Sequence, residues 1–289
     1  MTEEVVITCV GDLVEDVIVY APEGVRVGTD SPARVERHRG GSAANVAVAA
    51  ALFGGTARYV GNVGHDLLGY HLLAQLSTAG VEIAVTRSGR SGSIVAVVDG
   101  NAERSFLTDR GSAGDLTSAP DGWLLHTAVV HVPMYSLLAD PMRATTLEML
   151  DGARGHNVGI SLDASSTGAI ADAGVGAARD LIERIAPDYL FCNHDEAELL
   201  RITQPDRLAT VTIIKQGAKA TVVYSDAGVD TYPVAPVDDV VDTTGAGDAF
   251  AAGFLVTKFQ RAGSQAAAVA AAHLLAARTI IAHGATPRF

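Results

Sequence analysis

The second half of the chain alternates between short apolar runs and longer helical segments, and this alternation limits the folds open to it. Continuous apolar runs of about five residues are typical of buried parallel strands. The expected strands are Ala128–Val132, Gly159–Asp163, Tyr189–Cys192, Val211–Lys215 and Thr221–Tyr224. The expected helices are Met142–Arg154, Val175–Ile185, Asp195–Arg201, Ala246–Lys258 and Ser264–Ala282. This order predicts an α/β fold, a doubly wound sheet sandwiched by helices on both faces.

The first part of the chain adds to this sheet and interrupts it. Val5–Val10 is a buried-strand pattern, and Ser42–Phe53 is an apolar, Ala-rich helix pattern. Two β-rich pieces, at about 13–39 and 91–111, fit neither layer, and Asp99-Gly100-Asn101 predicts a hairpin turn within the second. We expect one domain over 1–289, in which these pieces form a small β-sheet lid over the carboxyl edge of the main sheet.

Composition excludes several classes of protein. The 289 residues are 48% hydrophobic, which is enough for a large core, and the net charge of −12 disfavours nucleic acid and anionic membranes as partners. The two cysteines, Cys9 and Cys192, lie in apolar runs, so we expect no disulfide scaffold and a reducing, cytoplasmic setting. No signal-peptide pattern is present, and the Ala-rich segment 266–282 predicts a buried helix and not a membrane span.

The segment Val241–Phe250 carries the strongest chemical signal. Gly245, Ala246 and Gly247 form a small-residue turn that opens into an apolar helix, and Asp248 follows in its first turn. Backbone N–H groups at a helix start bind anions, and a carboxylate beside a bound phosphate can deprotonate an attacking hydroxyl. Phosphoryl transfer is therefore the first hypothesis. The chain has no GxSxG nucleophile motif, no Walker GxxxxGK[ST] and no GxGxxG after its first strand.

Two further groups of residues lie where an acceptor could bind. Gly40 and Gly41 precede a helix and permit close approach of a ligand to the backbone, and the Asn45 amide can both donate to and accept from a hydroxyl. The alternative is a tight loop with a surface asparagine. Asp12 and Asp16 follow the first strand, where they either grip vicinal hydroxyls or belong to a solvated turn.

A polar cluster follows the strand at Tyr189–Cys192. Asn193 and Glu196 belong to it, and a carboxylate at this place could hold Mg²⁺ through waters. His194, Asp195 and Glu196 match no zinc spacing, and Asp195 is interpreted as a helix-start residue.

Together these motifs resemble the pfkB/ribokinase family of carbohydrate kinases along essentially the whole chain. The likeness rests on Gly40–Asn45, on Asp242–Asp248 and on Asn193–Glu196, which matches the family's NxxE element, in this order and separation. The resemblance implies a ribokinase-like fold, ATP and Mg²⁺ as cofactors, and a small sugar as substrate. The family often forms dimers through its lids, so a homodimer is an expectation.

The resemblance also implies roles for individual residues. Asp248 would be the general base, and Gly245, Ala246 and Gly247 would steady the charge on the transferred group. Glu196 would order Mg²⁺ through water. The implied sugar-binding residues are Asp12, Asp16, Gly40, Gly41 and Asn45. The implied nucleotide-side residues are Asn193, Lys215, Gly217 and His273. A monovalent cation, K⁺, would bind at Asp242, Thr244, Thr279 and Gly284.

Some features depart from ribokinases proper. Ser42 stands where they usually carry Lys, and Pro133-Met134 stands where they tend to place a sugar-binding acid, so ribose is not favoured. The lid arginines Arg37, Arg39, Arg104 and Arg110 either serve a sugar phosphate or belong to a solvated strand face. The function expected is ATP-dependent phosphorylation of a sugar hydroxyl. The alternatives are a nucleoside or sugar-phosphate kinase of the same fold, and a sensor without chemistry.

Overall fold

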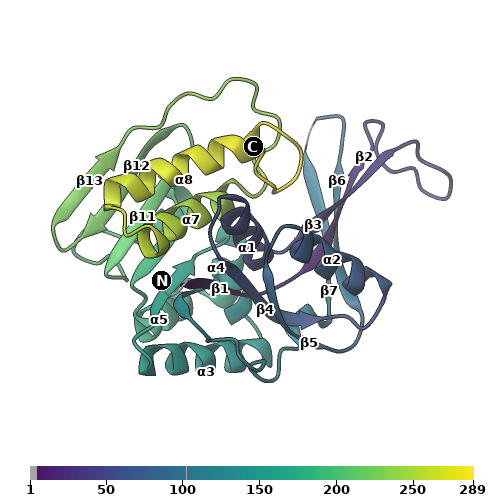
Figure 1. Cartoon of the computed structure of the whole chain (residues 1–289). Coiled ribbons are helices and arrows are strands. Elements are labelled where there is room, and N and C mark those ends of the chain that lie inside the picture. The colour runs from purple at the N-terminus through teal and green to yellow at the C-terminus, as the bar shows by residue number, and fades with distance from the viewer. Residues whose placement is uncertain (1–4, 102) are drawn as a thin grey trace.

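A computed structural model describes residues 5–101 and 103–289. In these residues the main sheet has nine strands in the order β13-β12-β11-β10-β9-β8-β1-β4-β5 (Figure 1). The seven strands from β11 to β5 are parallel to one another, and β12 and β13 add an antiparallel edge. The strand bounds are β1 Val6–Val10, β4 Ala57–Val63, β5 Glu82–Arg87, β8 Thr127–Pro133, β9 Gly159–Asp163, β10 Tyr189–Asn193, β11 Val211–Gln216, β12 Lys219–Ser225 and β13 Gly228–Tyr232.

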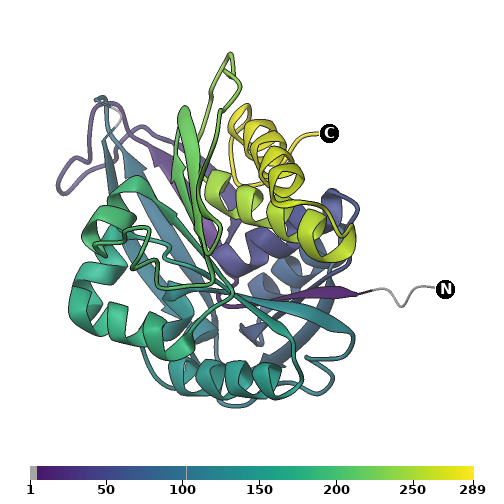
Figure 2. The same ribbon diagram turned by 90° about the vertical axis from the view of Figure 1, so that its left-hand side faces the viewer.

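Helices cover both faces of this sheet, and the central strands β1 and β4 are accordingly buried on both sides, whereas the edge strand β5 is partly exposed. Side chains of β1 alternate between two cores: Ile7 and Cys9 face one, and Val10 faces the other. The first core is closed by α1 Ser42–Leu52, α2 Leu67–Thr78, α7 Ala246–Leu255 and α8 Gln265–Ile280. The second is closed by α3 Met142–Gly155, α4 Thr167–Ala173, α5 Val175–Ile185 and α6 His194–Leu199. Figure 2 shows the two helical layers on opposite sides of the sheet.

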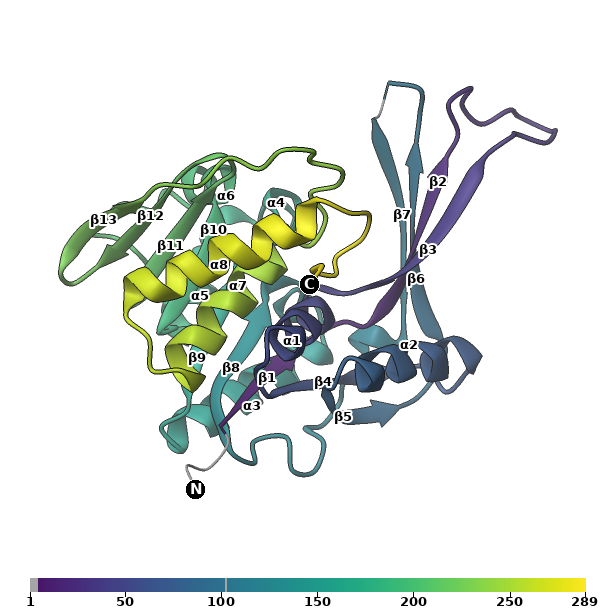
Figure 3. The same ribbon diagram turned by 45° about the horizontal axis from the view of Figure 1, so that its top comes forward.

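A second, four-stranded sheet rises beside the carboxyl edge of the main sheet (Figure 3). Its order is β3-β2-β6-β7, with bounds β2 Val14–Tyr20, β3 Arg34–Gly40, β6 Ser91–Val98 and β7 Arg104–Gly111. We call this sheet the lid. The chain passes directly from β1 through 11–13 into β2, and from β3 into α1, and it enters the lid again from β5 into β6 and leaves it after β7.

The predicted α/β fold with a sheet between helices and a smaller lid is confirmed. Sequence patterning missed β3, β5, β13 and the short helix α4. The strand β3 reads Arg-Val-Glu-Arg-His-Arg-Gly and has no apolar alternation, because both faces of the lid are partly exposed. Pairing with β2 and the ion pair of Arg37 with Glu15 (2.6 Å) hold it instead. The predicted helix 246–258 continues beyond Leu255 as a π-helical turn, Val256–Gln260.

Shorter features connect these elements. Ser112–Gly114 and Met134–Leu137 form 3₁₀ turns. Asp66 caps α2 by accepting from the Gly69 N–H at 2.7 Å. None of the helices within the described ranges is long and apolar enough to cross a membrane.

Candidate active site

The turn before α7 leaves backbone donors free at the carboxyl edge of the sheet. Gly245 has φ +74°, a conformation that favours glycine, and a Cβ there would lie 2.3 Å from the Cβ of Ala285. Helix α7 begins at Ala246 and has no side-chain cap. The Ala246 N–H donates to the Thr243 carbonyl at 3.2 Å, which leaves the Gly247 and Asp248 N–H groups as the donors available to an anion. The local geometry is that of an anion-binding helix start.

Asp248 lies in the first turn of α7 and lines a cavity of about 1050 Å³. Its Oδ1 accepts from the Ser42 hydroxyl at 2.7 Å, and its Oδ2 accepts from the Asn45 amide at 2.9 Å. Burial raises the pKa of Asp248 to about 6, against the lowering effect of these two hydrogen bonds. Both partners are neutral, so the carboxylate is held in place but not neutralised, which suits a general base near neutral pH.

Asp12 and Asp16 lie on the lid side of Asp248. Asp12 is buried, pairs with Arg110 of β7, and keeps its Oδ1 without a partner. Arg110 in turn lies over the ring of Tyr135, 5.1 Å from its centroid, and Tyr135 lines the cavity. Burial raises the pKa of Asp16 to about 6, and the nearby Arg39 opposes this rise.

The paired glycines fit closely around these acids. A Cβ on Gly40 would lie 2.4 Å from the Asp16 carboxylate, and one on Gly41, at φ +97°, would lie 2.1 Å from the Asp12 carbonyl oxygen. Asn45 stands one turn into α1 and reaches Asp248. The five residues predicted to bind the sugar therefore lie close together at the N-terminal end of α1, where Asn45 contacts Asp248.

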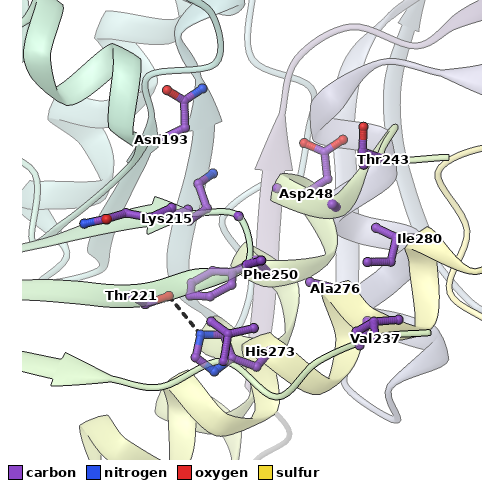
Figure 4. Close-up of a pocket in the computed structure, with 18 of the residues that line it drawn as sticks. Asn193, Lys215, Thr221, Val237, Thr243, Asp248, Phe250, His273, Ala276 and Ile280 are labelled. Atoms are coloured by element: carbon purple, nitrogen blue, oxygen red, sulfur yellow. Dashed lines mark hydrogen bonds between the residues drawn. The ribbon is translucent and has the colours of Figure 1, made fainter. Parts of the chain in front are cut away.

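A buried charged cluster lies on the other side of the cavity. Lys215 at the end of β11 donates to Asp163 of β9 at 2.9 Å, and the Lys215 Nζ lies 3.1 Å from the place a Cβ on Gly247 would take. Burial lowers the pKa of Lys215, but the charges of Asp163 and Glu196 outweigh it and raise that pKa. Figure 4 shows the Lys215 amino group in the region between Asn193 and Asp248.

Asn193 and Glu196 form a capping box at the start of α6. The Asn193 side chain accepts from the Glu196 N–H at 2.8 Å, and the Glu196 carboxylate accepts from the Asn193 backbone N–H at 2.7 Å. Burial, and then the charge of Asp163, raise the pKa of Glu196. Two buried acids that face a cavity fit Mg²⁺, which is commonly held by one or two carboxylates, waters and substrate phosphates. Within the ranges described, no three His, Cys, Asp or Glu residues gather as a ligand set.

An apolar compartment extends the cavity below Lys215. His273 of α8 is 2.8 Å from the Thr221 hydroxyl, and its ring centroid is 5.6 Å from that of Phe250 (Figure 4). Gly217 forms the turn after β11 with φ +62°. The walls are mostly aliphatic: Val234, Ala235, Pro236, Val237, Val240, Ala270, Leu274, Ala276, Ala277 and Ile280. A flat heteroaromatic ring fits such a compartment.

Asp242, predicted as a cation ligand, is already engaged. Its Oδ1 accepts from the backbone and the hydroxyl of Thr244, and its Oδ2 accepts from the Gly284 N–H at 3.2 Å. Arg104 of the lid lies 3.5 Å from its Oδ1. The Thr279 hydroxyl donates to the Leu275 carbonyl within α8. The Asp242 side chain is therefore engaged by hydrogen bonds and a guanidinium, and a K⁺ ion bound by this loop and the Thr244 carbonyl stays a prediction.

Three residues of the site were not singled out for these roles by sequence reasoning. Asp163 is the last residue of the buried parallel strand β9. An acid at the carboxyl end of such a strand is the sequence signal that could have identified it. Ser42 was noted only as a departure from Lys, and it holds the Asp248 carboxylate. Arg39 was considered only as one of four lid arginines, and it is buried against Asn45.

Comparison with known proteins shows the family and the fold of the chain. The family model of the pfkB family carbohydrate kinases matches residues 6–288. A fructokinase of Klebsiella pneumoniae is 28% identical over 243 residues, 78% of each chain, and an adenosine kinase of Saccharomyces cerevisiae is 30% identical over 248 residues, 75% of this chain and 70% of that one. The solved structure of a putative ribokinase II from E. coli, in complex with ATP and Mg²⁺, shares the fold with a TM-score of 0.82, at 20% identity over 98% of this chain and 94% of that one. The chain belongs to the pfkB family of carbohydrate kinases and is a kinase that phosphorylates a hydroxyl group.

Proposed function

We propose that this kinase transfers the γ-phosphoryl group of ATP to a hydroxyl of a small, uncharged sugar, with Asp248 as general base. The observation that carries the proposal is the Asp248 carboxylate, which lines the cavity beside the free N–H groups of α7 and is fixed by two neutral donors. The negative charge of the transferred group is matched by the lysine and the backbone donors around it.

In the reaction, the acceptor hydroxyl loses its proton to Asp248 as its oxygen attacks the γ-phosphorus. The bond from phosphorus to the β-phosphate bridging oxygen breaks, and ADP leaves with that electron pair. The N–H groups of Gly247 and Asp248 and the Lys215 ammonium stabilise charge on the transferred group. Glu196 and Asp163 would hold Mg²⁺ through water, and the ion would neutralise phosphate charge when bound.

The base of the nucleotide would occupy the aliphatic compartment around His273 and Phe250. The cavity connects that compartment to Asp248, and Lys215 and Gly217 border it along the way. One cavity would therefore hold the base of ATP beside His273 and its γ-phosphate beside Asp248.

The lid arginines favour an acceptor without a phosphate. Arg37 pairs with Glu15, Arg110 with Asp12 and Arg104 with Asp242, and Arg39 is bonded to Asn45. A phosphate on the acceptor would have to compete for Arg37, Arg104 and Arg110 against the acids that pair with them. In contrast, the Asp12 Oδ1, which is buried and has no partner among the described residues, and the Asp16 carboxylate would accept hydrogen bonds from sugar hydroxyls.

The test is an ADP-release screen over fructose, ribose, ketodeoxygluconate, their phosphates and adenosine. We expect the highest kcat/KM for a neutral sugar, with phosphorylated or carboxylate-bearing acceptors at least about tenfold lower. Adenosine is included because of the similarity to an adenosine kinase. Preference for a sugar phosphate or for adenosine would contradict the proposed acceptor class. A homodimer through the lid and a cytoplasmic location stay predictions.

A further inference from the structure

Arg39 is an unusual residue for a lid strand because it is buried. It is the last residue but one of β3, at the junction with α1, and only 7% of it is exposed. A guanidinium is rarely buried without partners that repay its desolvation. Arg37, two residues earlier on the same strand, has a side chain that is 65% exposed and pairs with Glu15.

Arg39 is connected to Asp248, the proposed base, by two hydrogen bonds through Asn45. Its Nη1 donates to the Asn45 Oδ1 at 2.7 Å, and the Asn45 Nδ2 donates to the Asp248 Oδ2 at 2.9 Å. A guanidinium has donors only, so it fixes which end of the amide faces it. The amide NH₂ is thereby turned toward Asp248, and two hydrogen bonds in the same direction lead from the Arg39 guanidinium through Asn45 to the Asp248 carboxylate, which accepts.

The second arm of Arg39 reaches the C-terminal loop. Its Nη2 donates to the Thr286 hydroxyl at 3.3 Å. The neighbouring Ala285 lies against Gly245, where a Cβ would come within 2.3 Å of it. The same guanidinium thus connects the lid strand, the support of the base and the loop behind the anion-binding turn.

Few positive charges face Asp248. The charged or titratable groups that act on it are Cys9 from β1, Asp16 from β2, Arg39 from β3, Asp163 from β9 and Lys215 from β11. Among these, Arg39 and Lys215 are the cations, and Lys215 is paired with Asp163. Arg39 has no carboxylate within hydrogen-bond distance among the contacts described, and the charges of Asp248 and Asp16 both favour its cationic form.

We propose that Arg39 is a positioning residue for phosphoryl transfer, which orients the Asn45 amide toward Asp248 and keeps that carboxylate ionised. This inference rests on the proposed role of Asp248 as base. It assigns to one lid residue two separable effects, one through the amide and one through charge.

The test compares Arg39→Met and Arg39→Lys with the matched control Arg37→Met. We expect Arg39→Met to lower kcat by about 10- to 100-fold, as for loss of a buried charged hydrogen bond, with the KM for ATP changed less than about threefold. Loss of the cation favours the protonated acid, so the acid limb of the kcat–pH profile should move upward. Arg39→Lys should leave that limb in place and still lower kcat, because an ammonium cannot hold both Asn45 and Thr286 in the same way.

Thr286→Val and Asp16→Asn complete the design. Thr286→Val should cost less than about tenfold in kcat and leave the limb unmoved, since the amide contact stays. Because Asp16 also faces Arg39, the Arg39→Met profile is repeated in Asp16→Asn, where the upward shift should persist. Thermal unfolding and circular dichroism verify that each variant is folded. Arg37→Met should behave as the wild type.

Several results would overturn the proposal. A folded Arg39→Met enzyme with wild-type kcat and an unmoved acid limb is one. If Arg39→Met does not fold, an Arg39→Lys enzyme with kcat within twofold of wild type is another. An inactive Asp248→Asn enzyme together with unaffected Arg39 variants would reject this inference alone, whereas an active Asp248→Asn enzyme would reject the proposed base.

Discussion

Replacing Lys215 by Met tests how much the buried ammonium contributes to phosphoryl transfer. The substitution keeps the approximate length of the side chain and removes its charge. Lys215 has a side chain only 15% exposed, its Nζ is 2.9 Å from Asp163, and it lies against Gly247 in the anion-binding turn. A phosphoryl group bound to that turn would therefore contact the ammonium directly.

The size of the effect follows from Coulomb's law with partial neutralisation. Two unit charges about 4 Å apart interact by ~4 kcal/mol at an effective dielectric constant of 20. Asp163 shares the Lys215 charge, so we take about half to three quarters of that value for the transition state. A loss of ~2–3 kcal/mol corresponds to a kcat about 30- to 150-fold lower.

The assay is steady-state ADP release at saturating ATP and sugar, with Lys219→Met as the control. Lys219 is an exposed lysine at the start of β12, four residues along the chain. Lys215→Met leaves Asp163 buried without its cation, so thermal unfolding must accompany the kinetics. The double variant Asp163→Asn/Lys215→Met removes that unpaired charge and should recover stability but not kcat.

A folded Lys215→Met enzyme with kcat within about threefold of wild type would refute this reasoning. It would mean that the backbone N–H groups and the metal carry the charge stabilisation alone. Equal losses in Lys219→Met would show that the effect is not specific to the site.

Three further predictions follow from the same geometry. The pKa of Asp248 is raised to about 6 and the base must be ionised, so kcat/KM should fall about tenfold per pH unit below pH 6 and level off above it. A pH series of kcat/KM measures this, and a flat profile from about pH 5 to 8 would contradict it. Gly245→Ala places a Cβ 2.3 Å from that of Ala285 and should lower both the midpoint of thermal unfolding and kcat, whereas Gly228→Ala, at φ +119° with nothing within 4 Å, should leave kcat unchanged. Arg104 and backbone donors already engage Asp242, so replacing K⁺ by Na⁺ at equal ionic strength should change activity less than about twofold and the midpoint of thermal unfolding by less than about 1 °C. A requirement for K⁺ would contradict this expectation and support the cation site implied by the family.

The parts of the site that could be predicted from the sequence are local in the chain. The turn at Gly245–Gly247 and Asp248 are neighbours in sequence, and a glycine turn that opens into an apolar helix is typical of an anion-binding helix start. The Asn193–Glu196 capping box is similarly contained within four residues. For such segments the backbone alone brings the groups together.

The parts that could not be predicted depend on distant partners. Lys215 meets Asp163 across 52 residues, and Arg104 meets Asp242 across 138. No periodicity encodes which strand ends become neighbours, so the charge balance of Lys215 and of Asp242 appears only in the fold. The edge strand β3 was missed for a related reason: its polar residues are satisfied by pairing with β2 and by ion pairs, and not by a hydrophobic face.

The partners of the lid arginines also could not be predicted from the sequence. Composition alone left open whether they serve a substrate phosphate or solvent. The structure gives each of Arg39, Arg104 and Arg110 a partner within the protein, two on carboxylates and one on an amide. These contacts link the lid to the catalytic edge.

The most direct test of the proposed base is phosphoryl transfer by Asp248→Asn, measured as single-turnover ADP formation with sugar binding followed in parallel by calorimetry. The amide keeps the shape of the side chain and cannot accept the hydroxyl proton. We expect sugar and ATP to bind within about fivefold of wild type, while the transfer rate falls by about 10³-fold or more. Transfer within tenfold of the wild-type rate, in a variant that binds both substrates, would contradict the assignment of this carboxylate as the base.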